Sequence, residues 1–197
     1  CHSDEVLIVD DDDDKTVARY RTKTGSRICV AYLVADKAPL AIPDLAEIDN
    51  RIDFSDDEWR RWSDKLSYEG PFKSDFVRCA LSLKFLLYAK TGAIAAAATS
   101  GLPERIGGEK NYDYRYAWIR DAAYTIKAFL RAGALSEAIG AIGWLIRTID
   151  EDGPTPSVVY TLDGREVPDE QVIKVPGYRG STPVRTGNRA KNQIQLS

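Results

Sequence analysis

Two helix-like segments follow one another almost without a connector, and this feature limits most strongly how the chain can fold. The first runs from about Trp118 to Ala132 and stops at Gly133, a residue type that commonly ends helices. The second starts at Ser136 and ends before the Gly153-Pro154 pair. Because so short a connector makes neighbouring helices run in opposite directions, the sequence predicts an antiparallel helical hairpin. Its inward-facing residues, at helical spacing, would be Ile119, Ala122, Ala123, Ile126, Phe129 and Leu130 in the first helix and Ala138, Ile142, Leu145, Ile146 and Ile149 in the second.

A helix is also predicted further upstream, in a tryptophan-rich segment. Ser55 to Glu58 has the composition of a capped helix start, and Trp59, Trp62 and Leu66 follow at helical spacing. The two tryptophans could form a platform for a sugar. We favour the alternative, a connecting helix that packs this stripe onto a neighbouring domain.

The segment after Gly70-Pro71 predicts another helix, with Ser74 or Asp75 as its cap. It is apolar almost all round, so we expect it to be buried. Cys79 within it is expected to be a small core residue. The apolar residues of this helix are Phe76, Val77, Ala80, Leu83, Phe85, Leu86 and Leu87.

The first part of the chain lacks helical spacing and predicts β structure. Short strands are expected at Val6–Val9, Thr16–Tyr20 and Arg27–Val34. The acidic run Asp10–Asp14 lacks the alternating spacing and the glycine of a calcium loop, so we interpret it as a solvated turn. Pro39 to Phe54, with its proline and acidic residues, predicts a linker.

Loops dominate the predicted structure around and after the helical hairpin. Thr91 to Gly108 is a long, glycine-punctuated loop that leads into the hairpin, and loops of that length are often functional. Val158 to Val167 predicts a β-hairpin about Asp163-Gly164. Pro176 to Gly187 predicts an irregular segment. Asn188 is a residue type typical of a helix start, so a further helix is predicted to begin there.

Charge and composition exclude several classes of function. The net charge is −3 and no basic stripe occurs, which argues against nucleic acid or an anionic membrane as a partner. No apolar run approaches the roughly 20 residues of a membrane-spanning helix, so a soluble and cytoplasmic chain is expected. His2 is the only histidine and the three cysteines are widely spaced, so the sequence predicts neither a metal site nor a cofactor. Carboxylates are left as the acid–base groups.

The chemistry is concentrated in residues 107–124. Within Asn111 to Tyr124 lie four tyrosines, one tryptophan, two arginines and two aspartates, directly before an apolar helix. Aromatic faces stack on a sugar ring, and paired charges hydrogen-bond its hydroxyls. This cluster therefore suits a polar, ring-shaped ligand.

These segments resemble glycoside hydrolase family 15, the group of glucoamylases, glucodextranases and bacterial trehalases. The resemblance runs from about Trp59 to the end, and the first 50 residues match only loosely. The family usually has tryptophan where Tyr112 stands. The matching motifs are residues 88–94, 102–108, 111–121, 176–180 and 183–188.

The resemblance implies a mainly α fold: the first helices of an (α/α)6 barrel, preceded by the last strands of a β-sandwich domain. Residues 1–50 would end the β-sandwich, residues 51–70 would form a linker helix, and residues 71–197 would begin the barrel. The absence of methionine predicts that the chain starts inside a longer protein. The remainder of the same polypeptide is then an expected partner.

The resemblance also implies roles for four residues in binding the substrate. Arg120 and Asp121 match an arginine–aspartate pair that binds hydroxyls of the terminal glucose, and the two groups suit that task chemically. Tyr114 matches a tyrosine that lies against the reacting ring. Trp118 matches a tryptophan of the same motif, which serves as an apolar wall or as a contact to the ring. The simpler alternative for Arg120 and Asp121 is an ordinary ion pair near a helix start.

The family inverts the anomeric centre with two glutamates, and no position in this chain matches either one, so no catalytic residue is predicted here. Glu104, Glu109 and Asp113 are interpreted as loop and capping residues. Two roles are equally supported for Arg179, Arg185 and Asn188: they could form part of the wall of the site, or they could support a loop.

The leading hypothesis is a segment of an inverting, exo-acting α-glucoside hydrolase. Its substrate would be a starch-like oligosaccharide, dextran or trehalose, from which it would release glucose. The alternative is a non-catalytic carbohydrate-binding or structural fragment.

Overall fold

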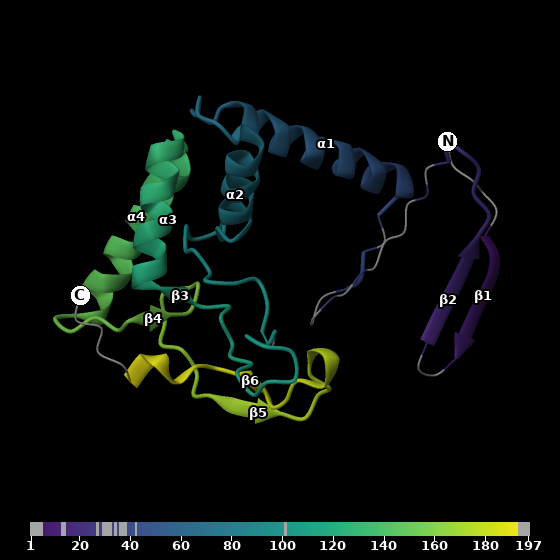
Figure 1. Ribbon diagram of the computed structural model, residues 1–197. Coiled ribbons are helices and arrows are strands. Elements are labelled where there is room, and N and C mark those ends of the chain that lie inside the picture. Colours follow the sequence, from purple (N-terminus) through teal and green to yellow (C-terminus); the bar gives the residue numbers. More distant parts are fainter. Residues whose placement is uncertain are drawn as a thin grey trace. The chain divides into compact units, whose positions relative to one another are not determined.

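The computed structural model describes residues 6–12, 15–26, 28, 33, 35, 39–41, 43–100 and 102–192. The chain divides into two compact units, residues 1–60 and 61–197. Helices dominate the described residues and the strands are short, which confirms the mainly α prediction (Figure 1). No helix in these ranges combines the length and the apolar character that crossing a membrane requires.

The first unit contains a β-hairpin made of β1 (Val6–Asp12) and β2 (Lys15–Tyr20). The strands are antiparallel, with Asp12 opposite Lys15, and the register is irregular between Val6 and Ile8. Both predicted strands are confirmed, but β1 extends into the acidic run that was expected to be a turn. The predicted strand at 27–34 falls largely outside the described residues.

Helix α1 (Leu45–Asp64) begins ten residues before the predicted start at Ser55. The Asp44 carboxylate accepts a hydrogen bond from the Ala46 amide at 3.2 Å, and this replaces the expected cap. Residues 45–54, where proline and acidic residues suggested a break, are therefore helical. One of these acidic residues, Glu47, pairs with Arg51 one helical turn later.

Helix α2 (Lys73–Phe85) follows Phe72, which has a left-handed backbone with φ of 64°. Ser74 and Asp75 lie inside the helix, so neither is the cap. The prediction of a buried helix is also wrong within the described chain, because Cys79 is exposed and Phe85 is 68% exposed. Ala80 of α2 is buried in the core, and Phe76, Val77 and Leu83 are partly buried against it.

Helices α3 (Ile119–Ala132) and α4 (Leu135–Asp152) form the predicted antiparallel hairpin, side by side in Figure 1. Gly133 ends α3 with a φ of +77°, which an L-amino acid with a side chain rarely adopts. The Ser67 amide donates to the Ala132 carbonyl at 2.9 Å and fixes the end of α3. The buried core against which these helices pack consists of Leu66, Ala80, Ile94, Ile126, Phe129, Ala132, Ala134, Ala138 and Ala141. The predicted inward positions Ala123, Leu130 and Ile146 are wrong within the described chain, because all three are exposed.

A buried carboxylate joins three segments of the second unit: the last residues of α1 (61–64), α2 and α4. Trp62 Nε1 donates to Glu137 Oε1 at 2.8 Å, and Lys84 Nζ lies 2.6 Å from the same oxygen. Ser136 Oγ donates to the other oxygen at 2.7 Å. Burial by itself raises the pKa of Glu137, but the hydrogen bonds from Lys84 and Ser136 outweigh it and lower the pKa. Glu137 is therefore ionised at neutral pH and joins Trp62, Lys84 of α2 and its own helix α4.

Four short strands complete the second unit. Strand β3 (Ala117–Trp118) pairs with β4 (Val159–Tyr160), and β5 (Gln171–Ile173) pairs with β6 (Val184–Thr186), both antiparallel. A turn forms at the predicted Asp163-Gly164, where the Thr161 amide donates to the Arg165 carbonyl at 2.8 Å.

The predicted β-hairpin at Val158–Val167 is nevertheless wrong in its pairing, because β4 takes β3 as its partner. Two short 3-10 helices, Tyr178–Gly180 and Arg189–Asn192, lie in the last part of the chain. The second stands where a helix was predicted after Asn188, whose side chain accepts from the Ala190 amide at 2.8 Å.

We predict that Glu137→Ala lowers the free energy of unfolding by about 2–3 kcal/mol, because it removes the buried carboxylate to which Lys84, Trp62 and Ser136 donate. Urea unfolding followed by circular dichroism would measure the loss. Arg165→Gln removes a mostly exposed ion pair with Asp163 and should cost less than about 0.5 kcal/mol. Equal effects of the two substitutions would contradict the role given to Glu137.

Candidate functional site

The start of α3 is fixed by the strand pair β3–β4. Trp118 is extended, with φ of −89° and ψ of 135°, and its neighbour Ile119 begins the helix. The Ile119 amide donates to the Val158 carbonyl at 3.1 Å, which continues the strand pairing to the helix start. Arg120 and Asp121 therefore occupy the first turn of α3.

The Arg120–Asp121 pair is exposed and loosely joined. The Arg120 guanidinium nitrogen lies 3.5 Å from the Asp121 carboxylate oxygen, and the two side chains are 55% and 43% exposed. A charge-assisted hydrogen bond of this kind is usually about 2.7–2.9 Å long, so the pair leaves hydrogen-bonding capacity on both groups. A carboxylate in the first helical turn is also favoured by the helix dipole, with or without a ligand.

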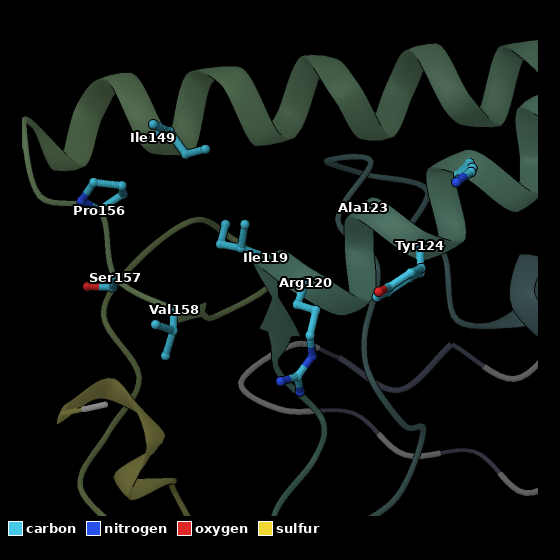
Figure 2. A pocket seen from close by; sticks show the side chains of 9 residues that line it. Ile119, Arg120, Ala123, Tyr124, Ile149, Pro156, Ser157 and Val158 are labelled. Atoms are coloured by element: carbon cyan, nitrogen blue, oxygen red, sulfur yellow. The ribbon is translucent and has the colours of Figure 1, made fainter. Parts of the chain in front are cut away.

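Arg120 lines a pocket along the first half of α3, shown in Figure 2. The pocket has a volume of about 460 Å³, within the range of small-molecule sites. Its wall does not include Tyr114, Trp118 or Asp121, so it brings together only one of the four predicted site residues. Its other lining residues are Ile119, Ala123, Tyr124, Lys127, Ile149, Pro156, Ser157 and Val158.

Tyr114 and Trp118 are brought together elsewhere, in a row of aromatic rings. Their ring centroids are 5.7 Å apart, and Tyr112 meets Tyr114 edge to face at 6.1 Å. Trp118 is buried against Val159 and Val167, whereas Tyr114 is half-buried at the edge of the same cluster. Trp118 is thus placed to support Tyr114 from behind, and Tyr114 is the more accessible of the two rings.

Tyr114 is held by its backbone and kept neutral by its surroundings. Its carbonyl accepts from the Ala97 amide at 2.9 Å, which ties it to the long loop before it. Burial raises the pKa of the Tyr114 phenol, and the negative charge of Glu104 and a hydrogen bond to that residue raise it further. The ring therefore presents an uncharged face at neutral pH.

Asp113, next to Tyr114, is the centre of this part of the structure. Its carboxylate is fully buried and accepts from Arg115 Nε and a terminal nitrogen, both at 2.8 Å, and from the Gly187 amide at 3.3 Å. Its carbonyl accepts from Asn188 Nδ2 at 3.0 Å. The predicted loop role of Asp113 is confirmed, but its burial and its contacts with residues 187–188 had no sign in the local sequence.

The pKa values of three hydrogen-bonded carboxylates, two of them buried and one exposed, limit what these groups can do chemically. Burial alone raises the pKa of Asp113, but the Arg115 hydrogen bonds outweigh it and lower the pKa. Asp152 also has a lowered pKa, because the Tyr160 hydroxyl donates to it at 2.6 Å and the Ser157 amide at 2.7 Å. A general acid for glycoside cleavage needs a raised pKa. Asp113, Asp152 and Glu137 therefore do not fit that role.

Comparison with known sequences defines the class of the protein. The family described as "Glycosyl hydrolases family 15" matches residues 70–196, a range that includes α2, the aromatic row and the α3–α4 hairpin. The chain belongs to this family. No solved structure matches it.

Individual relatives are named trehalases. A trehalase of Thermoplasma volcanium is 42% identical over 74% of this chain and 23% of its own length. A trehalase of Thermoplasma acidophilum is 41% identical over 74% of this chain and 25% of its own length. A trehalase of Mycolicibacterium smegmatis is 34% identical over 90% of this chain and 27% of its own length. The chain thus spans about a quarter of the length of these relatives.

We predict that Asp113→Asn destabilises the protein at pH 7 by about 2 kcal/mol and that this difference shrinks in acid. The folded-state pKa lies below the ordinary value of 3.8, so the charge contributes stability above that pH. The contribution is lost as the pH falls through the lower, folded-state value. Denaturant unfolding of both proteins at pH 7 and pH 3 would test this, and an equal difference at both pH values would contradict it.

Proposed function

We propose that the whole protein hydrolyses trehalose and that this chain supplies part of the wall of its glucose-binding site. Family membership and the trehalases among the relatives support an α-glucoside as substrate. The sugar-binding role proposed for this chain is supported mainly by the exposed, loosely joined Arg120–Asp121 pair at the start of α3. Its two groups are accessible and have spare hydrogen-bonding capacity.

Each site residue has a distinct part in this proposal. The Asp121 carboxylate accepts hydrogen bonds from two neighbouring sugar hydroxyls, and the Arg120 guanidinium donates to an oxygen of the same sugar. Tyr114 lies against the ring, where an electron-rich face favours a transition state that resembles an oxocarbenium ion. Trp118, buried behind Tyr114, keeps that ring in place.

The chemical step is proposed to use two glutamates that are supplied by the remainder of the polypeptide. One protonates the glycosidic oxygen, and the other removes a proton from a water molecule that attacks the anomeric carbon from the opposite face. The attacked glucose then leaves in the β configuration, while the other glucose of trehalose keeps its α configuration. Starch-like oligosaccharides and dextran are the alternative substrates.

The α3–α4 hairpin has several exposed apolar side chains. We propose that they pack against the remainder of the same polypeptide, as the first helices of an (α/α)6 barrel would. The main exposed apolar residues are Tyr124, Leu130, Leu135, Ile139 and Ile146.

We predict that Asp121→Ala in the full-length protein lowers kcat/KM for glucose release from trehalose by roughly 10²- to 10⁴-fold. Two hydrogen bonds to a charged group, each of about 1.5–3 kcal/mol, would be lost. Asp163→Asn alters an exposed carboxylate in a turn and serves as the control, with activity unchanged. Near-normal turnover by Asp121→Ala would contradict the sugar-binding role.

The substrate and the stereochemistry can be tested with the same protein. Trehalose, maltotriose and isomaltotriose are offered in parallel, and early products are followed by proton NMR. Inversion predicts equal initial amounts of α- and β-glucose from trehalose. Only α-glucose at early times would contradict inversion, and binding of all three sugars without hydrolysis would favour a non-catalytic carbohydrate-binding protein.

A further inference from the structure

We propose that Arg185 is a positioning residue that orients the sugar-facing ring of Tyr114 by way of Tyr112. This inference rests on the proposed function. Arg185 lies on β6, more than 60 residues after the aromatic row in the sequence. It reaches that row through a ring contact with Tyr112.

The guanidinium group of Arg185 is held by two acceptors. One of its terminal nitrogens donates to the Glu109 carbonyl at 2.6 Å, and Nε lies 3.3 Å from Glu170 Oε1. The Arg185 side chain is only 18% exposed, and Glu170 is also largely buried. Because the guanidinium is planar, two acceptors at different nitrogens fix the direction of its face.

The fixed guanidinium lies over an aromatic ring that leads to the proposed sugar site. Arg185 Cζ is 5.3 Å from the centroid of the Tyr112 ring, within the range of a cation–π contact. Tyr112 meets Tyr114 at an interplanar angle of 74°, and Tyr114 meets Trp118 at 51°. An unbroken series of contacts therefore runs from β6 to the start of α3.

Gly187 and Asn188, the two residues that follow β6, hold the backbone of the aromatic row in place. The Gly187 amide donates to the Asp113 carboxylate, and Asn188 donates to the Asp113 carbonyl. Asp113 lies between Tyr112 and Tyr114 in the sequence. Residues 185–188 therefore hold both the rings and the backbone from which the rings project.

Arg189 provides a matched control for Arg185. Its Nε lies 3.3 Å from the same oxygen of Glu170, the same distance as for Arg185. The Arg189 side chain is 79% exposed, so it pairs with Glu170 from the solvent side. Substitution of Arg189 removes an ion pair with Glu170 and leaves the contact between Arg185 and Tyr112 in place.

The proposal is tested in the full-length protein with Arg185→Gln, Tyr112→Ala, their combination, Tyr112→Phe and Arg189→Gln. We expect Arg185→Gln to lower kcat for trehalose about tenfold with little change in KM, because a misplaced ring weakens the transition state. In the Tyr112→Ala background the same substitution should add less than about a twofold effect, because Arg185 acts through Tyr112. Tyr112→Phe keeps the ring and should stay within about twofold of wild type, as should Arg189→Gln.

Three results would overturn the proposal. Equal, small effects of Arg185→Gln and Arg189→Gln would show that Arg185 only supports the loop. If the fold-loss of kcat in the double variant equals the product of the losses in Arg185→Gln and Tyr112→Ala, the two residues act independently. A rise in KM alone would show that Arg185 contacts the substrate itself.

If Arg185→Gln does not fold, Arg185→Lys replaces it, with a smaller loss of kcat expected because the charge is kept.

A protein that hydrolyses none of the three sugars would refute the proposed function without deciding the role of Arg185. Near-ultraviolet circular dichroism then decides it, because this signal reports the packing of aromatic rings. Arg185→Gln should change the spectrum in the wild-type background and leave it unchanged in the Tyr112→Ala background. A spectrum equally altered by Arg189→Gln would count against the proposal.

Discussion

The fully buried carboxylate of Asp113 is the constraint on which the candidate site depends. An ionised carboxylate out of water is tolerated only when donors surround it, and here they come from Arg115 and from the backbone of Gly187. These donors belong to segments far apart in the sequence, so the need to satisfy one charge brings the segments together. The aromatic row is built on the residues on either side of Asp113, and its geometry follows from that requirement.

The charged groups of the second unit fall into two kinds. Glu137 and Asp113 are buried, surrounded by donors, and have lowered pKa values, so they maintain the fold. Arg120 and Asp121 are exposed and separated by a longer distance. Only the second kind can exchange solvent contacts for a ligand without disturbing the core. This contrast separates the charges that maintain the fold from the exposed pairs, a group that also includes Lys110 with Glu104 and Arg165 with Asp163.

Local sequence was sufficient for elements that are stabilised locally. The α3–α4 hairpin was predicted because its helical spacing and Gly133 are contained in the segment itself. The start of α1 was missed because Glu47, an acidic residue that suggested a break, pairs with Arg51 along the helix, and composition alone does not show this pairing. The pairing of β4 with β3 and the burial of Asp113 were missed for a different reason. Both depend on contacts between distant segments, which a local sequence pattern does not show.

The position of Trp118 has a consequence for how such a protein can change its substrate. This residue ends β3, packs in the core against Val159 and Val167, and contacts Tyr114. A substitution that reshaped the proposed site at this point would also open a cavity in the core. Variation in substrate preference is therefore expected to accumulate in surface loops, where a change in shape carries no penalty in folding.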